Sequence, residues 1–276
     1  MLQQVSLLDA FKWRHSVRAF GAKLSSDQEK VVNDIIEAAN NVNVPFHSDG
    51  VKVCSTKESI TSYGVINNEY GWMFPAVPKN LQQSSQTDQY LATIDASYKC
   101  QIAMMNMSKF HIGTVWLSGS YGRKALEKTQ NGKYNVFAGI PFGNPSTDGT
   151  FISKLMKKFG NSNIRKEIDT IFFDVENKKP FTKENSKDLF PIFESLRWGP
   201  SAMNKQPWRF CVDGKKMHFF ADGMKMFTRI DMGIAMANAA LLSEEVLNHK
   251  PEFYVEKSEP TAFLGGNYLI TCNFRD

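Results

Sequence analysis

Residues 199–210 read GPSAMNKQPWRF, a dense polar turn between two apolar segments. Gly199 and Pro200 are expected to end the helix that DLFPIFESLRW (residues 188–198) predicts. Pro207 and Trp208 should pack behind the turn and hold it rigid, before a strand begins. The stretch therefore predicts a rigid polar loop between a helix and a strand.

The side chains of this loop suggest two uses. The backbone amides of Ser201, Ala202 and Met203 are expected to be free in the turn. Asn204 and Gln206 each carry a donor and an acceptor, so they could read the polar edge of a flat heterocycle or its polyol chain. Alternatively, the carboxamides cap the backbone of an ordinary helix-to-strand turn. Taken alone, the loop favours neither reading.

Two local matches predict an internal repeat. IDASYKCQIAMMNM (94–107) resembles IDMGIAMANAALL (230–242), which aligns Asp95 with Asp231 at a shift of 136 residues. NNVNVPF (40–46) resembles SAMNKQPW (201–208), which aligns Asn43 with Asn204 at a shift of 161 residues. A long loop after Ser55 would account for the difference. The sequence thus predicts two related halves, residues 1–170 and 171–276.

The remaining pattern is typical of a mixed α and β chain. Residues 25–42 predict a helix with a capping box of Ser26 and Glu29. Residues 55–89 show neither helical nor strand periodicity in their apolar residues. They suggest a long irregular loop, either a lid or a surface insertion. The matched segment after residue 94 reads as a buried central helix. Strands are expected within 111–119, 133–146, 215–222 and 267–274.

Composition excludes several classes of protein. The chain has 276 residues, 42% of them hydrophobic, with no run of about 20 apolar residues and no secretory signal. A cytoplasmic globular protein is therefore expected. The four cysteines form no CxxC pair and are expected to be buried thiols. The dispersed histidines predict no metal site. We find no Ser-His-Asp, Cys-His or paired-carboxylate pattern, so no catalytic side chain is predicted.

Charge points to a small anionic ligand. The formal net charge of +5 is spread along the chain, which suits such a ligand better than a nucleic acid. KLMKKF (154–159) could bind nucleic acid, but its lysines are few and helical spacing favours a solvated face. RHSVRAF (14–20) places Arg14, Ser16 and Arg18 on one side of an extended segment, as in a phosphate clamp. The alternative there is a solvated basic patch.

Together these motifs resemble the flavin-dependent nitroreductase family. The R-x-S-x-R segment at Arg14, Ser16 and Arg18 and the P-S-x-x-N-x-Q-P-W-R-F segment from Pro200 to Phe210 carry the resemblance. GTVWLSG (113–119) is similar to the family's segment beside the flavin ring, and NIRKEID (163–169) to its later phosphate-side segment. The resemblance covers most of the chain outside the long loop.

The resemblance implies an α+β, nitroreductase-like three-layer fold, with mixed or antiparallel sheets packed by helices, and tightly bound FMN. The phosphate would be held by Arg14, Ser16 and Arg18, with help from Arg165 or Lys166. The reactive edge of the ring would lie near the amides of residues 118–119. The loop after Pro200 would contact the ribityl chain and the ring edge. The implied cofactor-binding residues are Arg14, His15, Ser16, Arg18, Leu117, Ser118, Gly119, Arg165, Lys166, Pro200, Ser201, Ala202, Met203, Asn204 and Gln206.

The sequence departs from the family where each half has lost one motif. AANNVNVPF (38–46) keeps Asn43 but not the Pro, Ser and Gln, and NKKPFT (177–182) keeps Lys179 and Phe181 but neither arginine. This pattern is similar to a tandem branch in which two subunits are fused as a pseudo-dimer with one intact flavin site. Such a fusion would allow the chain to act as a monomer.

The implied function is an FMN-dependent oxidoreductase. It would take hydride from NAD(P)H and reduce a small electron-poor acceptor such as a nitroaromatic compound or a quinone, with no nucleic-acid or membrane partner. The alternative is a non-catalytic FMN-binding or flavin-storage protein. In that protein the loop after Ser55 would fill the nicotinamide side, with Tyr63, Tyr70, Trp72 and Phe74 covering the ring.

Overall fold

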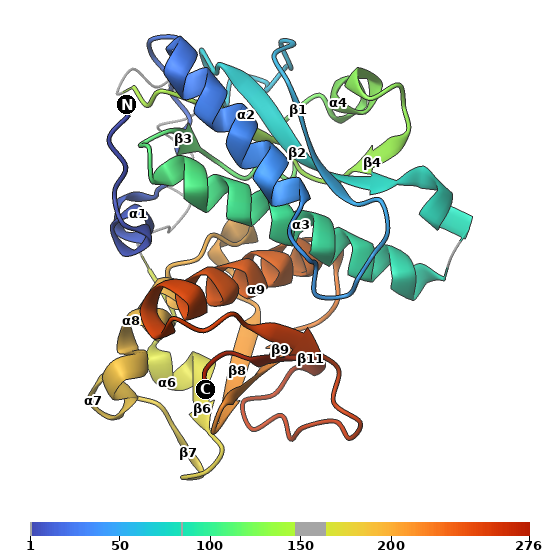
Figure 1. Ribbon diagram of the computed structural model, residues 1–276. Coiled ribbons are helices and arrows are strands. Elements are labelled where there is room, and N and C mark those ends of the chain that lie inside the picture. Colours follow the sequence, from blue (N-terminus) through green and yellow to red (C-terminus); the bar gives the residue numbers. More distant parts are fainter. Residues whose placement is uncertain (1, 84, 147–163) are drawn as a thin grey trace. The chain divides into compact units, whose positions relative to one another are not determined.

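The chain divides into two compact units, Met1–Asn161 and Ser162–Asp276. A computed structural model describes residues 2–83, 85–146 and 164–276 (Figure 1). The lysine-rich segment 154–159 lies outside the described residues. The unit boundary precedes the expected one at 170/171, because residues 164–166 bond to residues 204–206 of the second unit.

The first unit contains a five-stranded antiparallel sheet in its described part, in the order β1-β2-β5-β3, with β4 also paired to β2. Helices α2 and α3 pack on β1, and α3 also packs on β2. Along the chain the elements are α1 (Leu7–Trp13), α2 (Ser26–Asn40), β1 (Lys52–Thr56), β2 (Gly71–Pro78), the 3-10 helix η1 (Lys79–Gln83), α3 (Gln86–Ser108), β3 (Gly113–Thr114), α4 (Arg123–Thr129), β4 (Tyr134–Val136) and β5 (Ile140–Gly143).

The second unit contains a six-stranded sheet in the order β10-β11-β9-β8-β6-β7, antiparallel except for the β6–β8 pair. Helix α9 packs on β8 and on α8. The elements are α6 (Ile168–Ile171), β6 (Phe172–Asp174), β7 (Lys179–Pro180), α7 (Lys183–Ser186), η2 (Lys187–Leu189), α8 (Phe190–Arg197), η3 (Ala202–Asn204), β8 (Trp208–Asp213), β9 (Lys216–Ala221), α9 (Met226–Leu247), β10 (Glu252–Tyr254) and β11 (Asn267–Asn273).

The two sheets share four strands in the same order. In the first unit β1, β2, β5 and β3 are neighbours, and in the second unit β8, β9, β11 and β10 are neighbours. In each case a helix and a loop precede an antiparallel hairpin, a long helix follows the hairpin, and two further strands complete the set. The loop of interest, residues 198–207, therefore occupies the same place in its unit as residues 41–51 do in theirs.

Two local expectations in the first unit are wrong. Helix α2 is capped by Ser25, whose hydroxyl accepts from the Gln28 N–H at 3.2 Å while the Gln28 side chain accepts from the Ser25 N–H at 3.0 Å. Glu29 instead bonds Lys57 and the Tyr70 hydroxyl. Lys57 and Tyr70 are distant from Glu29 in sequence. The local pattern therefore could not show which of the adjacent residues Ser25 and Ser26 caps the helix.

The expected irregular loop over residues 55–89 contains the central strand β2. Seven of its eight residues, Gly71 to Val77, are buried. A strand buried on both faces does not alternate between apolar and polar residues. Its two prolines, Pro75 and Pro78, also argue against a central strand. The period is therefore absent for a structural reason, and both the lid and the surface-insertion interpretations are wrong for Gly71–Pro78.

The long helices α3 and α9 are buried along most of their lengths, as the apolar pattern predicted for the segment after residue 94. Each carries a buried aspartate in its first half. Asp95 accepts from the N–H groups of Phe46 at 3.1 Å and Ser48 at 3.0 Å, and Asp231 accepts from the N–H of Ala202 at 3.0 Å. Among the helices described, none is both long and apolar enough to cross a membrane. All four cysteines are free and buried.

Aromatic rings form the core beneath the loop of the second unit. Phe193 of α8 is fully buried and stacks on Phe172 with ring centroids 4.1 Å apart. Phe172 also stacks on Phe210 of β8 at 4.8 Å, and Phe181 meets Phe193 edge-on. The helix before the loop and the strand after it are thus joined through one ring cluster.

Truncation of this cluster should destabilise the second unit strongly. Phe193→Ala is expected to lower the free energy of unfolding by about 3–5 kcal/mol, because it leaves a cavity among packed rings. Phe263→Ala is the control, since Phe263 is 43% exposed and should cost less than about 1.5 kcal/mol. Urea unfolding of both variants measures the difference. Equal losses would show that the ring cluster does not hold α8 in place.

The buried Asp231 should make stability depend on pH. Burial raises the pKa of Asp231 to about 7, against an ordinary value of about 3.9. Between about pH 3.9 and about pH 7, Asp231 keeps its proton in the folded chain but has lost it in the unfolded chain. The contribution of this group to stability therefore falls by about 1.4 kcal/mol per pH unit as the pH rises.

Asp231→Asn removes this titration. Relative to the unmodified protein, the variant is expected to become steadily more stable between pH 4 and pH 7. Urea unfolding at several pH values tests this. A stability difference that does not change with pH over this range contradicts the raised pKa.

Candidate functional site

The first predicted cluster is an extended segment of the first unit. It begins where α1 ends, at Arg14 (φ −60°, ψ 123°). Ser16 forms a parallel bridge with Thr114, and the Val17 N–H donates to the Thr114 carbonyl at 3.1 Å. Arg14, Ser16 and Arg18 are partly buried, whereas the intervening Val17 is buried in the core. His15, which alternation would place on the side of Val17, is exposed, so the burial of residues 14–18 does not alternate strictly.

Arg18 has a buried donor without an acceptor. Its Nε is inaccessible to solvent and has no hydrogen-bond partner among the described residues. Burial also lowers the pKa of its guanidinium. A buried donor that is left unpaired costs about 1–3 kcal/mol, so this side chain is suited to an anion. These facts do not fit the solvated basic patch that was the alternative.

His15 lies apart from the clamp. Its side chain is exposed, its Nδ1 lies 3.1 Å from the Trp13 carbonyl, and its ring meets Trp13 edge-on. The ring is therefore engaged by its own neighbour on the chain.

The second predicted cluster, residues 117–119, follows β3 in the first unit. Leu117 is buried and exchanges two backbone hydrogen bonds with Gly139, at 2.9 and 2.8 Å. Ser118 and Gly119 are exposed. A Cβ placed on Gly119 would meet no atom within 4 Å. The backbone here borders open space, which leaves room for a ligand.

The polar loop of the second unit starts where α8 packs tightly on α9. A Cβ on Gly199 would lie 3.0 Å from the Leu196 carbonyl oxygen and 3.1 Å from the Asn238 amide nitrogen, so a side chain has no room there. Pro207 accepts from the Asp222 N–H at 2.7 Å, and Trp208 is fully buried. The predicted rigid support behind the loop is present.

The amides at the start of the loop are not all free, contrary to the expectation for residues 201–203. The Ala202 N–H donates to Asp231 Oδ1 at 3.0 Å. The loop also bonds itself, because Ser201 accepts from Asn204 N–H at 3.0 Å through its carbonyl and from Gln206 N–H at 3.0 Å through its hydroxyl. The bond to Asp231 joins residues far apart in sequence, which local reasoning could not detect.

Three residues of the loop that are not glycine have a left-handed backbone. Met203 has φ 51°, Asn204 has φ 54° and Gln206 has φ 47°. Asn adopts this region readily, but Met and Gln do so only when the surroundings require it. Backbone strain of this kind clusters at functional sites.

The carboxamides of the loop bond to residues 164–166. Arg165 donates to Asn204 Oδ1, and Asn204 Nδ2 donates to the Ile164 carbonyl at 2.6 Å. Gln206 Oε1 accepts from the Lys166 N–H at 2.9 Å, and the Gln206 carbonyl accepts from Lys166 Nζ at 3.1 Å. The carboxamides therefore pair mainly with residues 164–166, whereas the second interpretation placed their partners in the backbone of the turn, where Gln206 Nε2 donates to the Asn204 carbonyl at 3.1 Å.

Arg165 and Lys166 belong to the second unit, whereas the sequence analysis assigned them to the first half. The guanidinium of Arg165 lies 5.0 Å from the centre of the Trp198 ring. Its Nε is buried without a partner among the described residues. Burial lowers the pKa of both the Arg165 and Lys166 side chains. Asn163, the first residue of the NIRKEID motif, lies outside the described residues.

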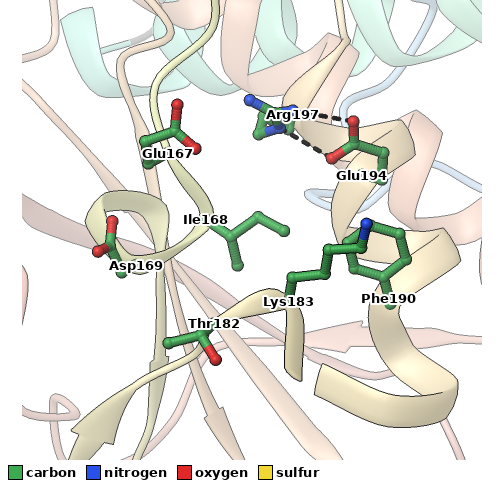
Figure 2. Close-up of a pocket in the computed structure, with 8 residues that line it drawn as sticks. All are labelled: Glu167, Ile168, Asp169, Thr182, Lys183, Phe190, Glu194 and Arg197. Atoms are coloured by element: carbon green, nitrogen blue, oxygen red, sulfur yellow. Dashed lines mark hydrogen bonds and ion pairs between the residues drawn. The ribbon is translucent and has the colours of Figure 1, made fainter. Parts of the chain in front are cut away.

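A separate pocket of about 290 Å³ opens in the second unit (Figure 2). Arg197 of α8 donates to both carboxylate oxygens of Glu194 at 2.9 Å and to the Lys166 carbonyl at 3.3 Å. Lys183 lies 5.5 Å from the centre of the Phe190 ring. The pocket contains no residue that the sequence assigned to a ligand. Arg197 instead connects it to the segment that pairs with Gln206.

Asp231 was not among the residues predicted for this site. The sequence did align Asp231 with Asp95 in the predicted repeat. That alignment gave no reason to connect either aspartate with a loop. Arg197 and Glu194 were missed as well, because an ion pair within one helix has no pattern of its own.

Comparison with known proteins identifies the family. A family model described as "Putative TM nitroreductase" matches residues 6–243. A solved structure from Thermotoga maritima, described as a "putative nitroreductase", is 17% identical, covers 100% of this chain and 97% of its own, and has a TM-score of 0.65. This likeness shows a nitroreductase-like fold. No curated protein matches the chain.

Two further solved structures match about half of the chain. A "putative nitroreductase in complex with fmn" from Desulfovibrio desulfuricans is 16% identical and covers 53% of this chain and 90% of its own, with a TM-score of 0.39. A "putative NAD(P)H:FMN oxidoreductase" from Staphylococcus epidermidis is 12% identical and covers 54% and 92%, with a TM-score of 0.42. Since the family model spans well over half of the residues, the chain belongs to the nitroreductase family that this model describes.

Proposed function

We propose that this protein is an FMN-dependent oxidoreductase that takes hydride from NAD(P)H and reduces a small electron-poor molecule, such as a nitroaromatic compound or a quinone. Family membership supports the general class. The observation that carries the proposal is the buried, unpaired Nε of Arg18 within the Arg14, Ser16 and Arg18 segment. A phosphate group would supply the missing acceptor.

The residues present fit such a cofactor. An arginine offers a phosphate two parallel donors, and a serine hydroxyl adds a third. No ion pair to Arg18 is found in the described part of the chain, so an incoming anion has no carboxylate to displace there. Arg165 and Lys166 add positive charge in the second unit, where we propose that they assist in holding the phosphate.

We propose that Ser201, Asn204 and Gln206 orient the ribityl chain and the polar ring edge. Each carboxamide has one acceptor oxygen and two donor hydrogens, so a ligand can add to or replace the bonds that residues 164–166 now make. The exposed amides of Ser118 and Gly119 would donate to the ring from the first unit.

When bound, FMN supplies the hydride chemistry itself. The chain is left with binding the cofactor, orienting it, and placing hydrogen-bond donors that tune its reduction. A protein whose cofactor carries out the reaction needs no nucleophile or acid–base pair of its own, and none was predicted from the sequence. The acceptor class is an expectation from the family, because the fold alone does not name a substrate.

We further propose that the two units are related halves that act as a pseudo-dimer within one chain. The shared strand order supports this proposal, as does the division of the motifs, with the arginines in the first unit and the P-S-x-x-N segment in the second. A single FMN per chain is then expected, and a monomer is sufficient for activity. The cytoplasm is the expected compartment.

The flavin-storage alternative loses much of its basis. It required aromatic residues after Ser55 to cover the ring. Trp72 and Phe74 are fully buried in β2, and the Tyr70 hydroxyl bonds Glu29. Of the four aromatic residues, Tyr63 is the one with a largely exposed side chain, at 67%.

Arg18→Ala should weaken FMN binding by about 10- to 100-fold, because it removes charge-assisted hydrogen bonds to the phosphate. Lys179→Ala is the matched control. Lys179 is an exposed residue of β7 in the segment aligned with the clamp, and its loss should change the dissociation constant by less than about twofold. Titration of each apoprotein with FMN, followed by fluorescence, measures both. Equal losses would exclude a single phosphate clamp at Arg18.

The purified protein should be yellow, and NADH or NADPH should bleach it under anaerobic conditions, with about one FMN per chain. Addition of a quinone or a nitroaromatic compound should then restore the colour. Absorbance spectroscopy with a measured FMN stoichiometry tests both steps. A yellow protein that neither nucleotide bleaches would support flavin storage, and two FMN per chain would contradict the one-site proposal.

A further inference from the structure

The strained loop of the second unit needs support from outside itself. The left-handed backbone at Met203 and Gln206 is unfavourable for residues with a side chain, so it persists only where the surroundings fix it. Bonds among Ser201, Asn204 and Gln206 close the loop on itself. Such bonds set the local shape of the loop, but they cannot set its position relative to the rest of the unit.

Helix α9 supplies that position. It contacts the loop at two places, Asn238 beside Gly199 and Asp231 at the Ala202 N–H. Residues 231 and 238 are seven apart, which is two helical turns, so they lie on the same face of the helix. One face of a buried helix therefore meets both the start of the loop and its first turn.

The acceptor in the bond from Ala202 to Asp231 is shielded from solvent. Asp231 is 3% exposed, and a hydrogen bond to a carboxyl group without competing water is stronger than one at the surface. The contact with residues 164–166 is mixed, because Gln206 is also buried whereas Asn204 is partly exposed and Ile164 is largely exposed. The bond to Asp231 is the contact that joins the loop to a buried helix.

We propose that Asp231 is a positioning residue that anchors the 201–206 loop, so that Asn204 and Gln206 are held ready for a flat heteroaromatic ligand. The identity of that ligand as FMN rests on the function proposed above. Asp231 itself does not touch the ligand. It acts through Ala202, by fixing where the strained turn begins.

The first unit provides an internal comparison. Asp95, aligned with Asp231 in the predicted repeat, accepts from Phe46 and Ser48 in the corresponding loop. The donors are not at aligned positions, since they follow Asn43 whereas Ala202 precedes Asn204. Among described residues 41–49, His47 is the one with a positive φ, at 55°. The first unit therefore keeps an anchoring aspartate in a loop with one left-handed non-glycine residue, whereas the second unit has three.

Three variants separate positioning from general stability. Asp231→Ala removes the acceptor, Asp231→Asn keeps an acceptor oxygen without the charge, and Asp95→Ala makes the same truncation in the first unit. FMN affinity is measured by fluorescence titration of the full-length protein. Hydrogen exchange with mass spectrometry reports on the peptides that contain residues 199–207 and 43–50. Thermal melts establish that each variant is folded.

Asp231→Ala should weaken FMN binding by about tenfold or more and accelerate exchange at 199–207. Asp231→Asn should restore affinity to within about threefold of the unmodified protein. Asp95→Ala should accelerate exchange at 43–50 while FMN affinity changes by less than about threefold. If Asp231→Ala is unfolded, Asp231→Leu takes its place, because it fills the volume without an acceptor.

Two results would overturn the proposal. Unchanged affinity in a folded variant without an acceptor would show that the loop is positioned without Asp231. Equal losses in the Ala and Asn variants would show that the charge, and not the acceptor, matters. If the unmodified protein binds no FMN, the proposed function fails instead, and the exchange data still decide whether Asp231 anchors the loop.

Discussion

A carboxyl group shielded from water must find hydrogen-bond donors, and in each unit this requirement joins the long helix to the loop before the first hairpin. Asp95 meets it with two backbone amides of its loop, and Asp231 with one. The aspartate follows the hairpin in sequence, whereas the loop precedes it. One contact therefore closes the whole supersecondary unit of loop, two strands and helix, and fixes where the loop lies above the sheet.

The polar groups of the candidate site differ in how deeply they are buried and in how many of their hydrogen bonds are made. The Asp231 and Gln206 side chains are both buried, while the bond from Asn204 to Ile164 is exposed, and the carboxamides have spare hydrogen-bonding capacity. Arg18 and Arg165 each keep a buried Nε without a partner among the described residues. Native proteins rarely retain such donors, because each one costs free energy. Two unpaired guanidinium donors within the residues predicted to hold a phosphate are consistent with an anionic ligand.

The sequence predicted what depends on local pattern. The buried helix α3 and the rigid turn after α8 follow from spacing and from the conformations that Gly and Pro permit. What it could not predict depends on distant partners. Strand β2 is buried on both faces, so its sequence does not alternate between apolar and polar residues, and its two prolines are not typical of a central strand. Glu29 bonds Lys57 and Tyr70 in place of the expected cap, and the Ala202 amide bonds Asp231, which lies on a helix beyond the next hairpin.

The two units share a strand order and a buried aspartate but differ in their polar chemistry. The loop of the first unit has one left-handed residue that is not glycine, against three in the second, and lacks the Pro, Ser and Gln of the motif, while residues 177–182 of the second unit lack both arginines. The shared features hold the fold together, so each unit needs them for its own stability. Groups that contact a ligand are under no such requirement, since one copy per chain is enough. The proposed single FMN site thus explains why the structural anchor is present twice and each ligand motif once.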